Sequence, residues 1–286
     1  MNHSGTTEPT RHRAYHRRMG TEPPLRQGNL LPARALVTAW GLLVLLAVLA
    51  WVLTVGQARD MGVEPGTMGM AIPLFLLLWL TMMAAMMLPS VAPVAITWAR
   101  GIARRSTGVV RAGRTAAFVG GYLVVWTAFG LLAYGALAAT GDLVHDHPGA
   151  GRWIGCAAFA LAGLQQLGPL KNVCLRHCRS PMAQLMRYAQ FRHAARDFRV
   201  GAHHGLYCVG CCWGLMVVLI PLGVMNIAAM AGIAAVIFVE KLWRLGPVFS
   251  TVVGLVFLVF AGLAPFQDWL LPGLQPAGEP MHMDMR

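Results

Sequence analysis

Six long stretches of this 286-residue chain contain no Asp, Glu, Lys or Arg, and they restrict its fold more than any other feature. The stretches are residues 35–58, 65–99, 115–141, 153–170, 200–239 and 245–267. An α-helix needs about 20 apolar residues to cross the roughly 30 Å hydrocarbon core of a bilayer. A charge at the bilayer centre costs about 2.5–3.5 kcal/mol, so spanning helices keep their charges at the ends. Each stretch is therefore a candidate membrane span.

The stretch 200–239 is too long for a single span, because a helix of that length would measure about 60 Å. Three turn-forming or helix-breaking residues, Pro221, Gly223 and Asn226, lie near its middle. We therefore expect two spans joined by a tight turn. The sequence then predicts an all-α fold, a polytopic transmembrane helix bundle of about seven spans. The predicted spans are residues 36–55, 72–98, 115–138, 153–169, 207–223, 227–242 and 247–265.

Positive charge is distributed unevenly between the segments that connect these spans. If the N-terminus lies inside, the inner segments hold 20 of the 23 Lys and Arg residues, and the outer segments hold three. Cytoplasmic segments of membrane proteins carry such an excess, so we predict an N-in, C-out topology. The formal net charge of +12 follows mainly from this distribution, and we expect no nucleic-acid partner.

The same pattern divides the chain into three regions. Residues 1–34 contain Arg, His and Pro but no apolar core, so they predict a disordered basic cytoplasmic tail and not a signal peptide. Residues 35–265 form the predicted transmembrane helical domain, whose inner loop at 170–206 carries cysteines. Residues 266–286 form a short outer tail that contains Met and His. We expect a multi-pass protein in contact with the lipid bilayer.

Five of the six cysteines fall at the predicted inner face. Cys208, Cys211 and Cys212 belong to the segment HGLYCVGCCWGLM, and Cys174 and Cys178 belong to KNVCLRHC. Thiols in the cytoplasm are normally kept reduced, which disfavours a structural disulfide. The CxxxC and CxxCC spacings then indicate a metal site or a redox site. The alternative is that these small apolar side chains only fill contacts between helices.

Three histidines, His177, His203 and His204, lie close to these cysteines in the sequence. Each is either a further ligand or a solvated residue of the basic inner loop. The sixth cysteine, Cys156, stands alone near the outer end of a predicted span, and we expect it in the core.

Polar residues also lie within or at the ends of the predicted spans. Glu240 directly precedes Lys241 at the inner end of the sixth span, where it either accepts a proton from a thiol or forms a helix-end ion pair. Gln165 and Gln166 lie in the fourth predicted span, and we expect them and Asn226, which are polar groups within the membrane, to form hydrogen bonds between helices.

A methionine-rich segment, WLTMMAAMMLPS, lies in the second predicted span. Met82 and Met86 are four residues apart, as are Met83 and Met87, so they form two adjacent rows on one side of a helix. Thioethers are soft, uncharged ligands that suit Cu(I). The alternative is ordinary packing, because Met is a common filler of apolar cores.

Methionine and histidine recur on the predicted outer side. The chain ends in MHMDMR, which contains Met281, His282, Met283 and Met285. Met and His would then lie outside, Met at the midplane and Cys inside, in order of increasing strength as soft ligands. This series favours Cu(I), although the thiols also suit zinc.

Several segments resemble a bacterial family of predicted metal-binding integral membrane proteins, a domain of unknown function sometimes labelled copper chaperone. They are WLTMMAAMMLPS, LAGLQQLGPLKNVCLRHCRSP and HGLYCVGCCWGLM, and the resemblance extends from Trp40 to Leu263. It implies a polytopic protein of the bacterial inner (plasma) membrane that handles a metal. The ligands implied at matching positions are Cys174, Cys178, Cys208, Cys211, Cys212, Met82, Met83, Met86 and Met87.

The leading hypothesis is a non-enzymatic membrane protein that binds, delivers or translocates Cu(I), with a copper donor or acceptor protein as its partner. A second hypothesis is a membrane thiol–disulfide oxidoreductase in which Cys208 and Cys211 exchange with Cys174 or Cys178. A third is a non-catalytic assembly or partner protein that serves a copper enzyme.

Overall fold

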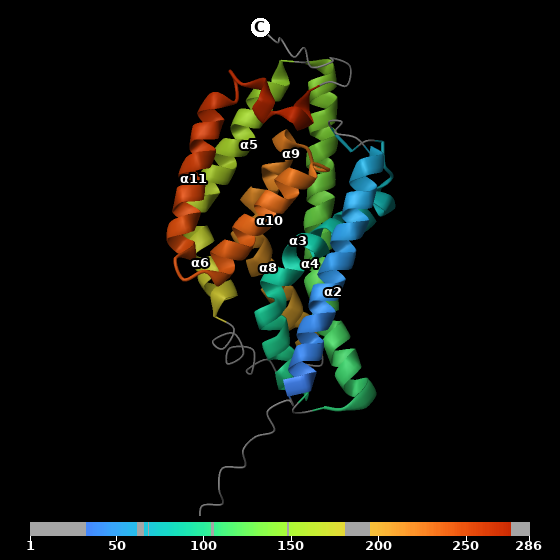
Figure 1. Ribbon diagram of the computed structural model, residues 1–286. Coiled ribbons are helices and arrows are strands. Elements are labelled where there is room, and N and C mark those ends of the chain that lie inside the picture. The colour runs from blue at the N-terminus through green and yellow to red at the C-terminus, as the bar shows by residue number, and fades with distance from the viewer. Residues whose placement is uncertain are drawn as a thin grey trace, which may run out of the picture.

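The computed structural model describes residues 33–61, 66–67, 69–103, 106–147, 149–180 and 195–275. Within these ranges the regular secondary structure is helical and no strand occurs, which confirms the all-α prediction (Figure 1). Most of the predicted basic tail and the Met- and His-containing segment MHMDMR lie outside the described residues.

Seven predicted spans coincide with helices, and a further helix, α6, carries the first two cysteines of the predicted site. The elements are α2 (Ala33–Met61), α3 (Ile72–Ala103), α4 (Gly108–Asp146), α5 (Ala150–Leu167), α6 (Pro169–Arg179), α8 (Arg196–Val217), α9 (Leu219–Leu222), α10 (Ile227–Leu242), α11 (Gly246–Leu263), η1 (Asp268–Leu270) and η2 (Pro272–Leu274).

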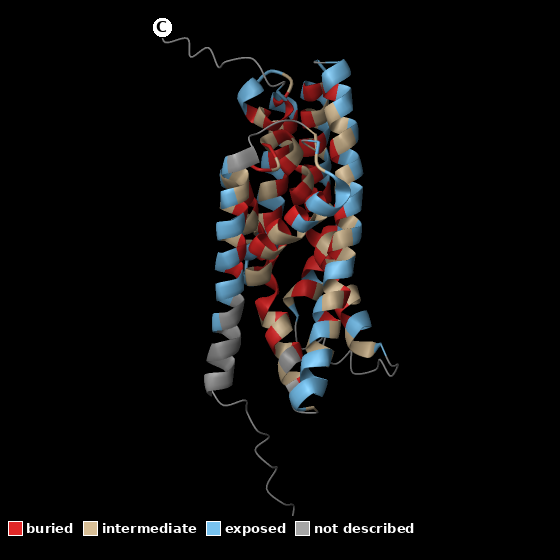
Figure 2. Cartoon of the chain, turned by 90° about the vertical axis from the view of Figure 1, so that its right-hand side faces the viewer, coloured by how far each residue is buried: buried red, intermediate tan, exposed pale blue. Residues whose placement is uncertain are grey.

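The helices form an elongated bundle. Figure 1 shows α5 and α11 paired along one edge, and α2 packed on α3 along the other. Between these edges lies α8, which crosses α4 and contacts α5, α6 and α10. Buried residues line the interior of the bundle, whereas α2 and α4 expose much of their surface (Figure 2). The cysteine-bearing α8 is therefore a central element.

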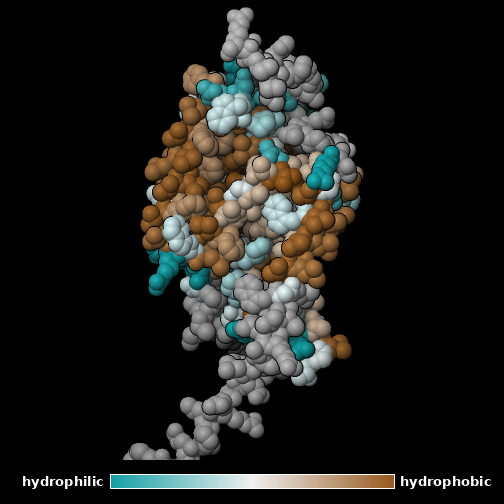
Figure 3. All heavy atoms as spheres, in the orientation of Figure 1, coloured by the Kyte–Doolittle hydropathy of each residue, from teal (hydrophilic) through white to brown (hydrophobic). Residues whose placement is uncertain are grey.

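The exposed surface of the bundle is largely apolar. Hydrophobic residues cover much of the described part of the face shown in Figure 3. On α2, for example, Leu45 and Val52 are 62% and 63% exposed, and on α11 Val248 and Val259 are also exposed. Large apolar surfaces of this kind mark contact with a membrane or another protein.

Three helices are long and apolar enough to cross a membrane, judged by length and composition. They are residues 72–102, 108–146 and 246–263, and Val44–Arg59 is a shorter apolar helix. These three support a membrane protein. The other predicted spans and the N-in, C-out topology remain predictions.

The predicted break in the stretch 200–239 is confirmed. The short helix α9 contains Pro221, and Gly223 follows it with φ = 90°, a conformation that favours glycine. Asn226 then caps α10, because its side-chain oxygen accepts a hydrogen bond from the backbone N–H of Ala229 at 3.1 Å. The turn and the cap together separate α8 from α10.

The α3 helix continues through Pro89 and Pro93, the two residues that follow its methionines. Neighbouring hydroxyl groups bond to the backbone of this region: Ser90 donates to the carbonyl oxygen of Met87, and Thr97 donates to that of Pro93. These bonds do not replace the N–H donors that the two prolines lack, because those donors would have reached the carbonyl oxygens of Ala85 and Pro89, four residues earlier.

Glycines allow α4 and α8 to approach closely. A Cβ atom at Gly121 would collide with the backbone of Phe198, and one at Gly201 would collide with the backbone of Phe118. Small residues at a crossing let two helix backbones come into direct contact. This contact fixes α8, and therefore its cysteines, against α4.

Candidate metal centre

The five cysteines of the predicted site all lie in the interior. Each is at most 9% exposed, and all belong to the main hydrophobic core. They come from two helices because α6 packs on α8. The cysteines Cys174, Cys178, Cys208, Cys211 and Cys212 are hereafter called the cysteine cluster.

Contacts within the cysteine cluster join the two helices. The Sγ atoms of Cys178 and Cys211 are 3.9 Å apart. Cys174 lies against Gly210, where an added Cβ would stand only 2.8 Å from its sulfur. Sulfur atoms of α6 thus pack directly on the cysteine segment of α8.

Two thiols of the cysteine cluster are hydrogen-bonded to the backbone. Cys211 and Cys212 donate to the carbonyl oxygen of Cys208, over 3.1 and 2.8 Å. In the part of the chain that the structure describes, no three His, Cys, Asp or Glu side chains are already grouped to hold a metal ion. Thiol side chains must therefore rotate before several of them can contact one ion.

Cys208 has the most polar surroundings in the cysteine cluster. The buried Nζ of Lys241 lies 3.2 Å from its Sγ, and the hydroxyl of Tyr122 lies 3.4 Å from it. Lys241 also donates to Oγ of Ser90 over 3.3 Å. A buried ammonium group is costly unless a negative charge compensates it. A thiolate at Cys208 is well placed to supply that charge.

A second buried lysine, Lys171, forms an ion pair with Glu240 over 2.6 Å. Gln166 donates to the other carboxylate oxygen of Glu240 over 2.6 Å, and Lys171 also donates to the carbonyl oxygen of Cys211 over 2.7 Å. The expected ion pair of Glu240 thus forms between helices. Its partner is Lys171 of α6 and not the adjacent Lys241. Successive residues of a helix point about 100° apart, so Glu240 and Lys241 face different neighbours.

The predicted interhelical bonds of the two glutamines are confirmed, whereas Asn226 makes only local bonds: it donates to the carbonyl oxygen of Leu222 and accepts from the backbone N–H of Ala229. Gln166 on α5 reaches Glu240 on α10, and the amide nitrogen of Gln165 donates to the carbonyl oxygen of Gly210 over 3.1 Å. Both bonds hold α5 against the helices that surround the cysteine cluster. Cys156, also on α5, is partly buried and packs against the core.

The four methionines of α3 are between 1% and 3% exposed. They share a helix face with Ser90, which lies four residues after Met86 and three after Met87. Ser90 contacts Lys241, and Lys241 contacts Cys208. The two methionine rows therefore end beside the cysteine cluster.

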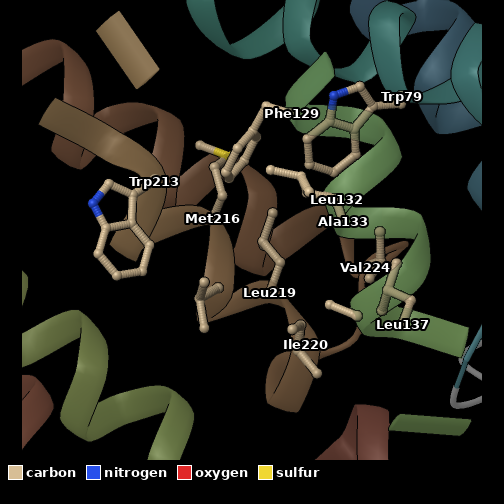
Figure 4. A pocket seen from close by; sticks show the side chains of 12 residues that line it. Trp79, Phe129, Leu132, Ala133, Leu137, Trp213, Met216, Leu219, Ile220 and Val224 are labelled. Carbon is tan, nitrogen blue, oxygen red and sulfur yellow. The ribbon is translucent and has the colours of Figure 1, made fainter. Parts of the chain in front are cut away.

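An apolar cavity of about 170 Å³ lies near the other end of the methionine rows (Figure 4). Trp79 of α3, Phe129 of α4, and Trp213 and Met216 of α8 contribute to its lining. Trp79 precedes Met82 and Met83 by about one helical turn, and Met216 follows Cys212 by about one turn. The cavity and the cysteine cluster thus lie at opposite ends of the methionine segment.

Ionisation differs among the groups that lie outside the predicted spans. A hydrogen bond to Cys211, together with burial, raises the pKa of Cys178 well above its usual value, and burial raises the pKa of Cys174. Both thiols are therefore protonated at pH 7. Burial and the nearby charge of Lys241 lower the pKa of His204 to about 3, so its ring is neutral.

No motif in the sequence predicts a role for Lys171, Tyr122 or Ser90 at this site. Their side chains, together with Lys241, surround the sulfur and backbone atoms of the cysteine cluster. The one feature that could have drawn attention to Lys171 is its position, because it lies between the uncharged stretch 153–170 and the CxxxC segment.

Comparison with protein families gives a match that agrees with the resemblance noted in the sequence. The model of the family PpoB2, described as copper chaperone, matches residues 76–264, a range that includes all nine predicted ligands. No curated protein and no solved structure matches the chain. The match covers well over half of the chain and supports a copper-related role. The protein is thus a member of the PpoB2 copper chaperone family.

Proposed function

We propose that this protein is a multi-pass membrane protein that binds Cu(I) at the cysteine cluster and passes it along the methionine rows of α3. The observation that carries the proposal is the contact series from Ser90 through Lys241 to Cys208, which joins the two sets of soft ligands. Membership of a copper chaperone family is the reason that copper is proposed as the metal. The protein acts without catalysis, and a soluble copper donor or acceptor is its partner.

The ligand chemistry suits this role. Methionine thioethers bind Cu(I) without adding charge to an apolar interior, whereas thiolates bind it more tightly. The ammonium group of Lys241, 3.2 Å from Cys208, offsets the charge of a thiolate in the core. An ion held by the cysteine cluster would therefore be bound tightly, and one on the methionines would be bound more loosely and could move.

The three long apolar helices and the apolar surface support a membrane location. The excess of Lys and Arg in alternate connecting segments supports the N-in, C-out orientation, which would place the cysteine cluster toward the cytoplasm. The bacterial inner membrane is the proposed location.

An anaerobic Cu(I) titration of the reduced protein, against a competing chelator, tests the proposal. The triple variant Cys208→Ser/Cys211→Ser/Cys212→Ser is expected to bind more than about 100-fold more weakly, because it lacks thiolates that contact the ion; even outer-sphere changes cost 10–100-fold. Cys156→Ser, outside the cysteine cluster, is the matched control. Equal affinity in the triple variant and the control would contradict the proposal.

The methionine rows are tested separately in liposomes that contain the purified protein. Substituting Met82, Met83, Met86 and Met87 together with Leu keeps the apolar volume but removes the thioethers. We expect Cu(I) uptake to fall to the background of protein-free liposomes, while Cu(I) affinity at the cysteine cluster stays unchanged. Uptake equal to that of the unmodified protein would limit the function to binding and delivery.

A second candidate function, thiol–disulfide exchange, is supported by the 3.9 Å separation of the Cys178 and Cys211 sulfurs. A disulfide has a sulfur–sulfur distance of about 2.05 Å, so a movement of about 2 Å would join them. A reversible loss of two thiols with changing redox potential, in protein that holds no copper, would favour this candidate.

A further inference from the structure

Three histidines lie beside the cysteine cluster, on the side facing the predicted cytoplasmic end. His177 directly precedes Cys178 on α6, and His203 and His204 precede Cys208 on α8 by about one turn. The two helices pack together, so the histidines of both meet at one place. Imidazole side chains thus lie close to the thiols of the cysteine cluster.

The rings of His177 and His203 are close enough to share one ion. Their centroids are 5.5 Å apart, with an angle of 69° between the ring planes. Two imidazole nitrogens bound to one metal at about 2.0–2.1 Å place the ring centroids at most about 6 Å apart. Both residues are partly exposed, whereas the cysteines are buried. An ion at this pair is therefore accessible from outside the core.

Tyr207 holds this pair in place. Its ring stacks on that of His177, with centroids 3.8 Å apart and an interplanar angle of 19°, and lies 4.9 Å from that of His203. Tyr207 also directly precedes Cys208 in α8. The same short segment thus positions the histidine pair and the first cysteine of the cluster.

His204 lies deeper, with 1% of its surface exposed. Its Nδ1 atom makes no hydrogen bond to any described residue. A buried polar atom without a partner is costly and calls for an explanation, such as an ion that binds there. The ring of His204 stacks on Tyr122, whose hydroxyl lies 3.4 Å from the sulfur of Cys208. His204 is therefore linked to the cysteine cluster through Tyr122.

The geometry points to a second Cu(I) site at His177 and His203, with His204 behind it, through which the ion passes between the cysteine cluster and a soluble carrier. Neutral imidazole binds Cu(I) but lacks the negative charge of a thiolate, so this site is the weaker of the two. Arg176 and Arg179 flank His177 and Cys178 in the sequence and disfavour a resident cation there. The inference rests on the proposed function, since the ion must have a tighter site to reach.

The test uses the full-length, reduced protein in detergent, loaded anaerobically with one and then two equivalents of Cu(I). X-ray absorption at the copper edge distinguishes sulfur from nitrogen ligands. The first equivalent is expected to have sulfur ligands, and the second to add nitrogen ligands. The variant His177→Asn/His203→Asn should lose the nitrogen signal and bind the second equivalent at least about 10-fold more weakly. His145→Asn/His147→Asn, at the C-terminal end of α4, is the matched control and should behave as the unmodified protein.

A kinetic measurement on the same proteins tests passage. Protein loaded with one equivalent is mixed with a Cu(I) chelator, and transfer is expected to slow at least about 10-fold in the His177→Asn/His203→Asn variant. A sulfur-bound first equivalent in that variant shows that it is folded. Unchanged nitrogen signal and transfer rate would overturn this inference alone. A first equivalent without sulfur ligands, in the unmodified protein, would instead overturn the proposed function.

Discussion

The two ends of the methionine segment of α3 have opposite chemistry. At one end, Trp79 and Met216 line an apolar cavity that has almost no polar surface. At the other, Ser90 meets Lys241 and Cys208 in a buried polar network. We call these the tryptophan end and the cysteine end. Buried charge is thus concentrated at the cysteine end, where we propose that an ion is held tightly, while the methionines along the rest of the segment are uncharged.

The largest expected effect is on stability at the cysteine end. Lys171→Met leaves the carboxylate of Glu240 buried without its ion-pair partner, which should lower the free energy of unfolding by about 3–5 kcal/mol. Chemical unfolding in detergent micelles measures the loss. The double variant Lys171→Met/Glu240→Gln removes both charges and should recover most of it. No recovery would mean that Lys171 contributes mainly through its bond to the Cys211 carbonyl oxygen.

The next effect concerns copper affinity. Lys241→Met removes the ammonium group beside Cys208, so a thiolate there loses its compensating charge, and Cu(I) should bind about 10–100-fold more weakly. Trp79→Phe, at the tryptophan end, keeps the apolar lining and should leave the affinity unchanged. Competition with a Cu(I) chelator measures both. If both variants lost Cu(I) affinity equally, the proposed difference between the two ends would be wrong.

Cu(I) affinity should depend on pH because of a thiol at the cysteine end. The raised pKa of Cys178 means that this thiol is protonated at pH 7 and must release its proton to bind a metal. Cu(I) affinity should therefore rise with pH between pH 6 and pH 8, by about tenfold per pH unit for each proton displaced. Titrations at several pH values measure the slope. Cys178→Ser should reduce it, and an unchanged slope would show that Cys178 does not bind the ion.

The smallest effect is expected at the tryptophan end. Ala133 lines the cavity, and Ala133→Val adds two methyl groups to that space. Filling a cavity commonly stabilises a protein by about 0.5–2 kcal/mol, and we expect the low end of this range because the cavity is partly open. Thermal unfolding measures the change. Cu(I) affinity should stay as it is; a clear loss of uptake into liposomes would instead place the cavity on the path of the ion.

The helices were largely predictable because charge is excluded from long apolar segments. The uncharged stretches predicted the positions of α3, α10 and α11. The residues Pro221, Gly223 and Asn226 predicted the break between α8 and α10. The residue types of the candidate site were also visible, since Cys and Met are recognisable soft ligands wherever they fold.

The polar surroundings of the site were not predictable, because they depend on which helices meet. Lys171 and Glu240 are 69 residues apart, and their pairing requires α6 to pack beside α10. In the sequence Lys171 is one more basic residue of an inner loop, and Lys241 appears as the natural partner of its neighbour Glu240. The contact between His177 on α6 and His203 on α8 could not be predicted for the same reason.

The close approach of α4 and α8 at Gly121 and Gly201 limits how the site can respond to an ion. At that crossing the backbones are so close that a side chain at either glycine would collide with the other helix, which limits how far α8 can move relative to α4. If the cysteine cluster binds an ion as proposed, we expect the cysteines of α8 to reach it mainly by turning their side chains. Such a site adapts through a few bond rotations and has little freedom to enlarge, which favours a small ion with few ligands over a larger coordination sphere.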